Sequence, residues 1–179
     1  MKHLGTITLT SDRLILRRIY EKDALEIFNG FINQEEFLYY ANKEKRTLKE
    51  EIDSLKGIDD KYLDPTYYNW LITLKEESII IGSINGHFNK EDETILINYA
   101  LDNRYTNNGY ASEALKSVIN YLLNEVKIKR IECGCVIKNK TSKRVIEKNN
   151  MIFQGIIKNY IKLKDGYHDI YLYYLENNN

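Results

Sequence analysis

The chain has 179 residues, 43% of them hydrophobic and 29% charged, with 26 Lys+Arg against 26 Asp+Glu. This length and composition predict one globular domain over residues 1–179, with a core from about residue 9 to residue 175, rather than a disordered chain. The balanced charge gives no field that would attract nucleic acid or anionic lipid, and no apolar run approaches the ~20 residues that span a membrane. Without a signal-peptide core at the start, the sequence favours a cytoplasmic protein with neither nucleic-acid nor membrane partners.

The first third of the chain predicts a strand and two helices. Ile7–Tyr20 alternates apolar and polar residues as a strand does, and Glu21–Ile32 has apolar residues at helical spacing. Thr47–Gly57 predicts a second helix that opens with a capping box, a threonine followed three residues later by a glutamate. Between the helices, Gln34–Asn42 forms an unusually aromatic connection.

The middle of the chain predicts three strands followed by a long helix. Tyr67–Thr73 and Ser78–Phe88 flank a charged turn, and Thr94–Leu101 is apolar and β-branched. From Ser112, the sequence SEALKSVINYLLNEV repeats apolar residues at intervals of three, four and seven, which predicts an amphipathic helix.

The loop before this helix, Asn107–Ala111, predicts an anion site. It contains residues that tolerate a positive φ angle, and it leads directly into a helix N-terminus. Such a loop points backbone N–H groups and the positive end of the helix dipole at one spot, which suits a phosphate. The dinucleotide fingerprint needs three glycines and only Gly109 is present, while the Gly-Lys-Ser/Thr of a Walker loop is absent.

The last third predicts a strand, a helix and a closing hairpin. Arg130–Ile137 is the strand, and its Cys133 and Cys135 lack partner ligands for zinc and lie too close in sequence for an ordinary disulfide, which favours buried thiols. Asn139 can cap a following helix, and Lys158–Leu163 pairs with Tyr167–Leu175 around a Lys-Asp-Gly turn. The three histidines are scattered and predict no metal cluster.

Four stretches together resemble the GNAT superfamily of N-acetyltransferases. Residues 106–111 are similar to its acetyl-CoA loop, Gln/Arg-x-x-Gly-x-Gly/Ala, and depart from it at Thr106. Residues 139–148 resemble its Asn-x-x-Ser-x-x-Val-x-x-Lys segment, although Asn150 and Met151 replace the Gly-Phe that follows. Residues 10–17 and 166–173 resemble the opening and the ending of the ribosomal-protein N-terminal acetyltransferases, the RimJ/RimL-type branch.

The resemblance implies the α+β, three-layer GNAT fold. Its sheet is mixed, mainly antiparallel and twisted, with six to seven strands flanked by about four helices. A parallel strand pair in the middle, ending near Leu101 and Ile137, splays apart into a slot for the pantetheine arm of acetyl-CoA. Acetyl-CoA is then the cosubstrate, with no metal.

The resemblance also assigns roles to residues. Cofactor contacts fall on Tyr99, Ala100, Leu101, Thr106, Asn107, Asn108, Gly109, Tyr110, Ala111, Asn139 and Ser142. Ser142 is expected to give a proton to the departing CoA thiolate, and an N–H near Ala100 or Leu101 to stabilise the oxyanion. Glu36, Tyr39 and Tyr40 border the acceptor pocket in such a fold, or serve only in packing.

The general base and the acceptor stay open. Leu96 occupies the place where family members often carry a catalytic glutamate, which leaves Glu36 or Asp169, acting through water, as alternatives. Three functions are compatible with the residues: acetylation of a protein N-terminal α-amine, acetylation of a small amine such as a polyamine or an antibiotic, and acyl-CoA binding without catalysis. The missing glutamate and Thr106 support the third. The sequence fits a monomer or a homodimer.

Overall fold

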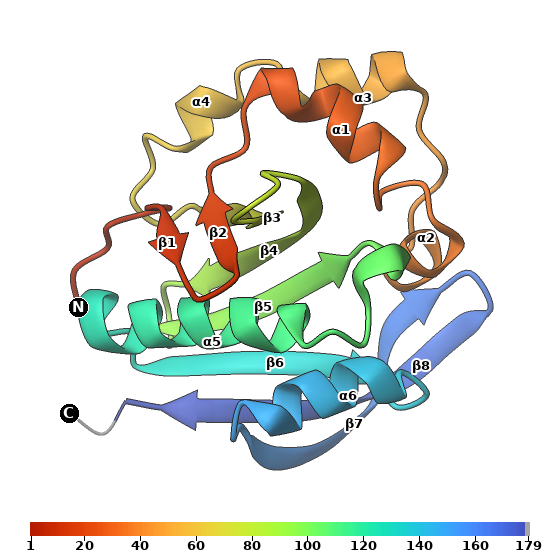
Figure 1. Cartoon of the computed structure of the whole chain (residues 1–179). Coiled ribbons are helices and arrows are strands. Elements are labelled where there is room, and N and C mark those ends of the chain that lie inside the picture. Colours follow the sequence, from red (N-terminus) through yellow and green to blue (C-terminus); the bar gives the residue numbers. More distant parts are fainter. Residues whose placement is uncertain (178–179) are drawn as a thin grey trace.

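The computed structural model describes residues 1–177, and its eight strands form a single sheet with the order β1-β2-β3-β4-β5-β6-β8-β7 (Figure 1). The strands are β1 Leu9–Thr10, β2 Leu14–Arg17, β3 Tyr68–Leu74, β4 Ile80–Asn89, β5 Thr94–Leu101, β6 Arg130–Val136, β7 Ile152–Leu163 and β8 Gly166–Glu176. The helices are α1 Ala24–Asn29, α2 Glu35–Tyr40, α3 Leu48–Leu55, α4 Ile58–Lys61, α5 Tyr110–Tyr121 and α6 Lys140–Lys148. Every neighbouring pair of strands is antiparallel except β5 and β6, which are parallel. The mixed sheet with a central parallel pair is therefore confirmed, with eight strands rather than six to seven and six α-helices rather than about four.

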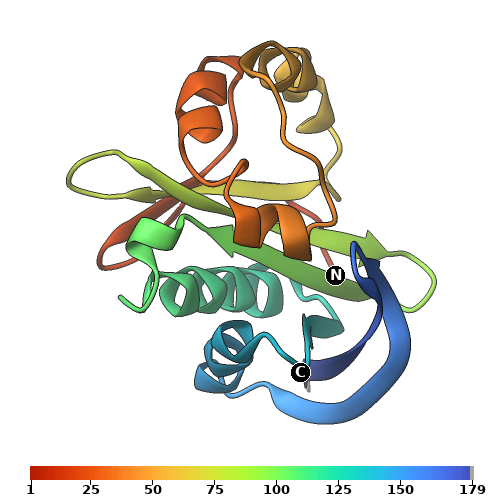
Figure 2. The same cartoon turned by 90° about the vertical axis from the view of Figure 1, so that its right-hand side faces the viewer.

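Helices cover both faces of the sheet (Figures 1 and 2). On one face α5 and α6 pack on the main core, where Trp70, Ile84 and Ile95 of the sheet are fully buried with Leu115 of α5. On the other face α1, α3 and α4 form a second, smaller core over β3 and β4, which includes Leu71. Since side chains alternate between the two faces of a strand, adjacent residues such as Trp70 and Leu71 can enter different cores.

The parallel strands diverge toward their carboxyl ends. Pairing between β5 and β6 stops at Ile97 and Cys133. Beyond that point β5 stays paired with β4 as far as Leu101, and β6 stays paired with β8 as far as Val136. The two strand ends therefore follow separate neighbours and leave a V-shaped slot between them.

A glycine allows β4 and β5 to stay close beside this slot. A Cβ atom at Gly82 would lie only 2.2 Å from the carbonyl oxygen of Ala100. Any other residue at this position would push β5 away from β4, so the slot edge depends on the missing side chain.

Two predicted elements near the N-terminus differ from the structure. Ile7–Tyr20 is not one strand but the hairpin of β1 and β2, because Ser11 makes the turn by exchanging hydrogen bonds with Leu14. The aromatic connection contains the helix α2, which begins after Gln34. The capping box of the next helix is confirmed, since Thr47 Oγ1 accepts a hydrogen bond from Glu50 N–H and the Glu50 carboxylate accepts one from Thr47 N–H.

The C-terminal half contains the predicted strand, helix and hairpin, although β7 begins at Ile152 rather than at Lys158. Asn150 has a φ angle of 57° and ends α6 where the family pattern has glycine, and Met151 is buried in the main core. Both thiols are buried, and burial raises the pKa of Cys135 to about 11, so neither cysteine is a reactive thiolate near neutral pH. Within residues 1–177, no helix combines the length and apolar character needed to cross a bilayer, and no three His, Cys, Asp or Glu side chains lie close enough together to hold a metal ion.

Candidate functional site

The loop before α5 and the first turn of this helix, residues 107–112, are called here the mouth of α5. Their backbone N–H groups bind nothing within the described chain. In the described residues, no N–H group from Asn107 to Ser112 donates a hydrogen bond, and Glu113 N–H is the first to do so, to Gly109 O. The loop turns through positive φ angles at Asn107 (63°) and Gly109 (83°). These N–H groups lie at the positive end of the helix dipole, which is the arrangement that the predicted anion site requires.

Arg13, in the turn between β1 and β2, contacts this loop and the first turn of α5. Its guanidinium donates to Asn108 O at 3.0 Å, pairs with the Glu113 carboxylate at 2.7 Å and stacks 4.4 Å from the ring centre of Tyr110. Arg17 of β2 likewise pairs with a carboxylate, that of Asp23, at 2.8 Å. The amides of the loop are thus held in place before any ligand arrives, which lowers the entropy lost on binding.

Along the edge of β5 that borders the slot, every second residue directs its backbone N–H and C=O groups into the slot. Asp102 N–H donates to Ile81 O of β4 at 2.8 Å. Because successive residues direct their N–H and C=O groups to opposite sides of a strand, the N–H of Ala100 also points toward β4, and those of Tyr99 and Leu101 point into the slot. Of the two amides expected near the oxyanion, the structure therefore aims the one of Leu101 into the slot.

Ser142 lies on the α6 side of the slot against Tyr99. Its Oγ is 2.8 Å from the Tyr99 hydroxyl, which also donates to Ser142 O at 3.1 Å. Burial raises the pKa of Tyr99, so its hydroxyl stays protonated through the neutral range. Asn139 caps α6 by accepting Ser142 N–H at 2.9 Å, and this fixes Ser142 on the turn that faces β5.

Helix α2 bridges the open end of the slot, on the face opposite α6 (Figure 2). At its start, the Gln34 side chain donates to Asp102 Oδ1 at 3.0 Å and accepts Asn103 N–H at 2.9 Å, just beyond β5. Near its end, Tyr39 donates to Asp165 Oδ1 at 2.7 Å, in the turn between β7 and β8. The helix is thus tied to both sides of the slot by side-chain hydrogen bonds.

Asp102 is a buried charge that sequence reasoning missed. It is fully buried, and the Arg104 guanidinium, with help from Gln34, lowers the pKa of its carboxyl to about 2. The only signal in the sequence was an aspartate placed directly after a buried strand, which does not by itself indicate a partner.

A polar cluster fixes Tyr39 at the other end of α2. Lys138 donates to the Tyr39 hydroxyl and pairs with Asp165 at 3.2 Å, and His168 Nε2 lies 2.8 Å from Asp165 Oδ1. Lys138 follows β6, whereas Asp165 and His168 belong to the β7–β8 hairpin, so no local pattern could have shown that they meet at Tyr39.

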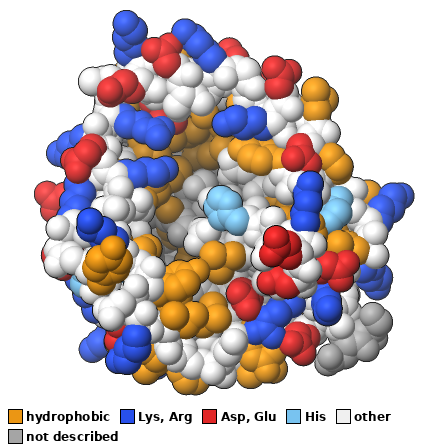
Figure 3. Space-filling model, turned by 180° about the vertical axis from the view of Figure 1, so that it is seen from behind, with side chains coloured by type: hydrophobic (Ala, Val, Ile, Leu, Met, Phe, Trp, Pro, Cys, Tyr) orange, Lys and Arg blue, Asp and Glu red, His pale blue; other side chains and the backbone are white. Residues whose placement is uncertain are grey.

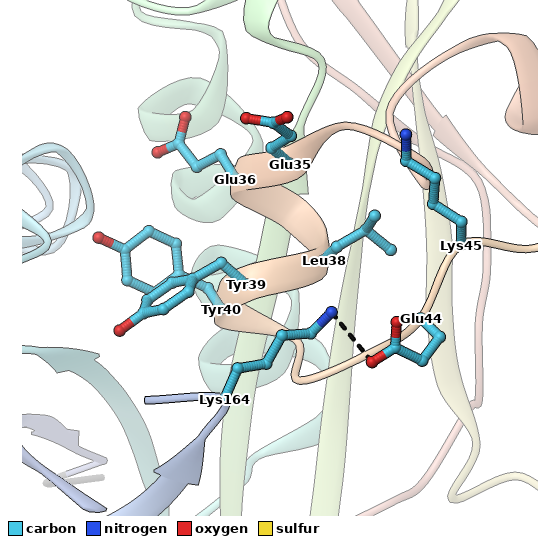
Figure 4. A pocket seen from close by; sticks show the side chains of 8 residues that line it. All are labelled: Glu35, Glu36, Leu38, Tyr39, Tyr40, Glu44, Lys45 and Lys164. Atoms are coloured by element: carbon cyan, nitrogen blue, oxygen red, sulfur yellow. Dashed lines mark ion pairs between the residues drawn. The ribbon is translucent and has the colours of Figure 1, made fainter. Parts of the chain in front are cut away.

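The predicted acceptor residues Glu36, Tyr39 and Tyr40 line one open pocket of about 720 Å³ (Figure 4). The two tyrosine rings meet edge to face 5.0 Å apart, and both extend from the same side of α2. Glu36 lies exposed in the first turn, and the ion pair of Lys164 with Glu44, at 3.0 Å, closes the pocket on one side. The structure therefore brings these three residues together at one pocket, from a single helix.

The two alternatives for a general base differ in their surroundings. Both carboxylate oxygens of Asp169 are occupied, one by Lys158 at 2.7 Å and the other by Asn159 N–H at 2.9 Å. The Lys158 hydrogen bond lowers the pKa of Asp169, which makes it a weaker base. Glu36 has no hydrogen-bond or ion-pair partner among the described residues, so its carboxylate is free to accept a proton.

A slot between splayed parallel strands, with unused backbone N–H groups at the helix N-terminus that follows one of them, is the arrangement of an acyl-CoA-dependent transferase. Residues 13–152 match the acetyltransferase (GNAT) domain family, and the chain belongs to this family. It is therefore an N-acetyltransferase that uses acetyl-CoA as its cosubstrate.

Individual relatives agree with this assignment over nearly the whole chain. The uncharacterized N-acetyltransferase YoaA of Bacillus subtilis is 27% identical over 154 residues, which cover 86% of this chain and 87% of YoaA. The ribosomal-protein-serine acetyltransferase of Escherichia coli is 25% identical over 167 residues, 91% of this chain and 92% of that protein. The crystal structure of a GNAT-family acetyltransferase from Bacillus anthracis superposes with a TM-score of 0.83 at 25% identity, covering 97% of this chain and all of that one. These similarities support the RimJ/RimL-like branch.

Proposed function

We propose that this enzyme acetylates the N-terminal α-amine of a protein or peptide, with the diphosphate of acetyl-CoA on the amides of Asn107–Ala111. The observation that carries the proposal is the end of β5–β6 pairing at Ile97 and Cys133, together with the unused N–H groups at the mouth of α5, the helix that follows β5. The pantetheine arm then takes the place of a strand along Tyr99–Leu101, and the thioester lies near Leu101.

The chemistry is direct attack of the amine on the thioester carbon. The new C–N bond forms as the carbonyl becomes an oxyanion, which the N–H of Leu101 stabilises. The C–S bond then breaks, and the thiolate takes the proton of the Ser142 hydroxyl, which Tyr99 holds in place at 2.8 Å, while Ser142 regains a proton from water. The amine loses its proton through water to Glu36, the exposed carboxylate on α2.

The choice of a peptide acceptor rests on similarity and on access. The relative from Escherichia coli is a ribosomal-protein-serine acetyltransferase. The pocket under Tyr39 and Tyr40 is open to solvent rather than closed around a small ligand, so a chain terminus can enter while the rest of the protein stays outside.

A small polyamine is the second candidate. Glu35 and Glu36 both lie exposed in the first turn of α2 and line the same pocket, where they would attract a second ammonium group. The assignment to an acetyltransferase family disfavours the non-catalytic binding module.

A CoA-release assay separates these functions. Purified protein is incubated with acetyl-CoA and, in turn, with peptides that begin with serine, alanine or leucine, with spermidine, and with an aminoglycoside. We expect turnover on peptides that have a free α-amine and none on the same peptides after N-terminal formylation. Turnover on spermidine alone would replace the peptide acceptor with the polyamine.

A further inference from the structure

Three asparagines lie side by side across the middle of the sheet. Asn69 of β3 is paired with Asn85 of β4, and Asn85 is paired with Asn98 of β5. Directly opposed residues on antiparallel strands point to the same face, so these side chains form one row, called here the asparagine row.

The asparagine row lies where helical cover of the sheet ends. Two residues further along each outer strand, Leu71 and Ala100 pack against the smaller core under α1 and α3, and they share the face of the row. Asn98 itself is exposed. Figure 3 shows this side of the molecule, hollowed next to the helices and lined mainly by uncharged and hydrophobic side chains, with lysine and arginine along its upper rim.

The row also begins at the slot. Asn98 directly follows Ile97, the last residue of β5 that pairs with β6. Its neighbour Tyr99 points to the opposite face, where it meets Ser142. Asn98 therefore lies at the closed end of the slot, on the face from which α2 and the acceptor pocket are reached.

One member of the row lacks a partner. Asn85 Oδ1 is the single buried side-chain nitrogen or oxygen in residues 1–177 without a hydrogen bond. The neighbouring Asn69 is satisfied by the Tyr67 hydroxyl, which accepts its side-chain N–H at 2.9 Å. A buried carbonyl without a donor costs about 1–3 kcal/mol, so natural proteins seldom keep one unless a ligand or water supplies the donor.

We propose that the asparagine row is the acceptor subsite for the first residues of a peptide, with Asn85 Oδ1 accepting a hydrogen bond from a peptide N–H or from the hydroxyl of an N-terminal serine. The inference rests on the proposed function and extends it to the residues that select the acceptor. Asparagine side chains carry both a donor and an acceptor, which match the alternating N–H and C=O of a peptide. A polyamine would instead need carboxylates for its additional charges, and the row has none.

The test exchanges the amide for a hydrocarbon of similar size. In Asn85→Leu the unpartnered oxygen is gone, so the melting temperature is expected to stay the same or rise. The KM for a serine-initiated peptide is expected to increase at least about tenfold, whereas the KM for acetyl-CoA stays within about twofold. Asn98→Ala, at an exposed position, gives a second variant whose folding is not at risk. Asn120→Leu, exposed on α5 and on the opposite face, is the matched control and is expected to leave both KM values unchanged.

The outcomes separate the subsite from the function. If the wild-type enzyme acetylates peptides and both Asn85→Leu and Asn98→Ala keep the peptide KM of wild type, the asparagine row does not bind the acceptor, and the proposed function stands. If the wild-type enzyme acetylates only polyamines, the peptide subsite and the peptide acceptor are both wrong. A rise in the KM for acetyl-CoA equal to that for the peptide would also overturn the subsite, since it would indicate a general disturbance of the slot.

Discussion

Ser142 and Tyr99 meet across the slot through two hydrogen bonds, and their environment suits the two hydroxyl groups to different roles. Tyr99 is held neutral, because burial raises its pKa, and it acts as a fixed partner. In the proposed mechanism, the Ser142 hydroxyl is the one that gives its proton to the departing sulfur. Its backbone N–H is already used by Asn139, so only the side chain is free for chemistry.

Replacing Ser142 with alanine tests this role. Alanine keeps the backbone N–H that Asn139 caps, so α6 is expected to remain folded and the KM for acetyl-CoA to stay within about twofold. Loss of a proton donor is expected to lower kcat between about 10- and 100-fold. Thr141→Ala, one residue away and exposed, is the control and should behave as wild type. A kcat for Ser142→Ala within twofold of wild type would exclude the proton-donor role.

At the residue scale, the sequence predicted which side chains belong to the site better than it predicted their contacts. Asn139 was predicted to cap a helix, and the structure shows its side chain accepting Ser142 N–H at the start of α6. The link between Tyr99 and Ser142, 43 positions apart, has no local signature. Asp102 and His168 were missed for the same reason, since their contacts with α2, through Gln34 and Tyr39, join residues far apart in the sequence.

At the scale of elements, a substitution at the N-terminus of α5 tests whether backbone N–H groups bind the diphosphate. Ala111→Pro removes one N–H group from the first turn, where no intrahelical bond is lost and proline is tolerated. The KM for acetyl-CoA is expected to increase about tenfold, while the melting temperature changes little. Ala111→Ser, which keeps the N–H group, is the matched control. An unchanged KM in the proline variant would mean that the diphosphate does not use this amide.

The attachment of α2 to the end of β5 predicts a pH dependence of stability. The folded-state pKa of Asp102 is about 2, below its unfolded value of about 3.9. The carboxylate therefore stabilises the fold fully above about pH 4, and this contribution is lost as the pH falls toward 2. The depressed pKa corresponds to roughly 2 kcal/mol.

Urea unfolding of wild type and Asp102→Asn measures this contribution. At pH 7 the variant is expected to be less stable by roughly 2 kcal/mol, and at pH 2.5 the difference is expected to shrink markedly. Asp53→Asn, at an exposed ion pair with Lys56, is the control and should change little at either pH. A difference between wild type and Asp102→Asn that is equal at both pH values would contradict the role assigned to the charge.

Helices and strands were predicted correctly where the hydrophobic pattern extends over many residues. They were predicted wrongly where the element is short or the turn is tight. The strand Thr94–Leu101 was predicted with the bounds that β5 has in the structure, because seven of its eight residues are apolar or β-branched and give a clear signal. The hairpin of β1 and β2 was read as one strand, since Ser11–Arg13 has neither glycine nor proline to mark the turn. Helix α2 was missed because its six residues are too few for a period to show.

For the whole molecule, we expect CoA to stabilise the folded state, mainly through the binding of its diphosphate. CoA at about one hundred times its Kd is expected to stabilise the fold by ~2.7 kcal/mol, which for a chain of this size raises the Tm by about 5 to 10 °C. Pantetheine, which lacks the diphosphate, is expected to give a much smaller shift at the same concentration. An equal shift with pantetheine would show that the mouth of α5 contributes little.

The order of the strands could not be derived from the sequence without the family resemblance. Periodicity predicts that strands exist, but the insertion of β8 between β6 and β7 depends on contacts far apart in the chain. The parallel pair, and with it the slot, was supplied by the resemblance, and the structure confirms both.

A crystal structure of the enzyme with CoA tests the central claim most directly. The diphosphate oxygens are expected within hydrogen-bond distance of the backbone N–H groups between Asn107 and Ala111, with the pantetheine arm beside Tyr99–Leu101 and its sulfur near Ser142. A diphosphate bound elsewhere on the molecule, with these N–H groups exposed to solvent, would contradict the account.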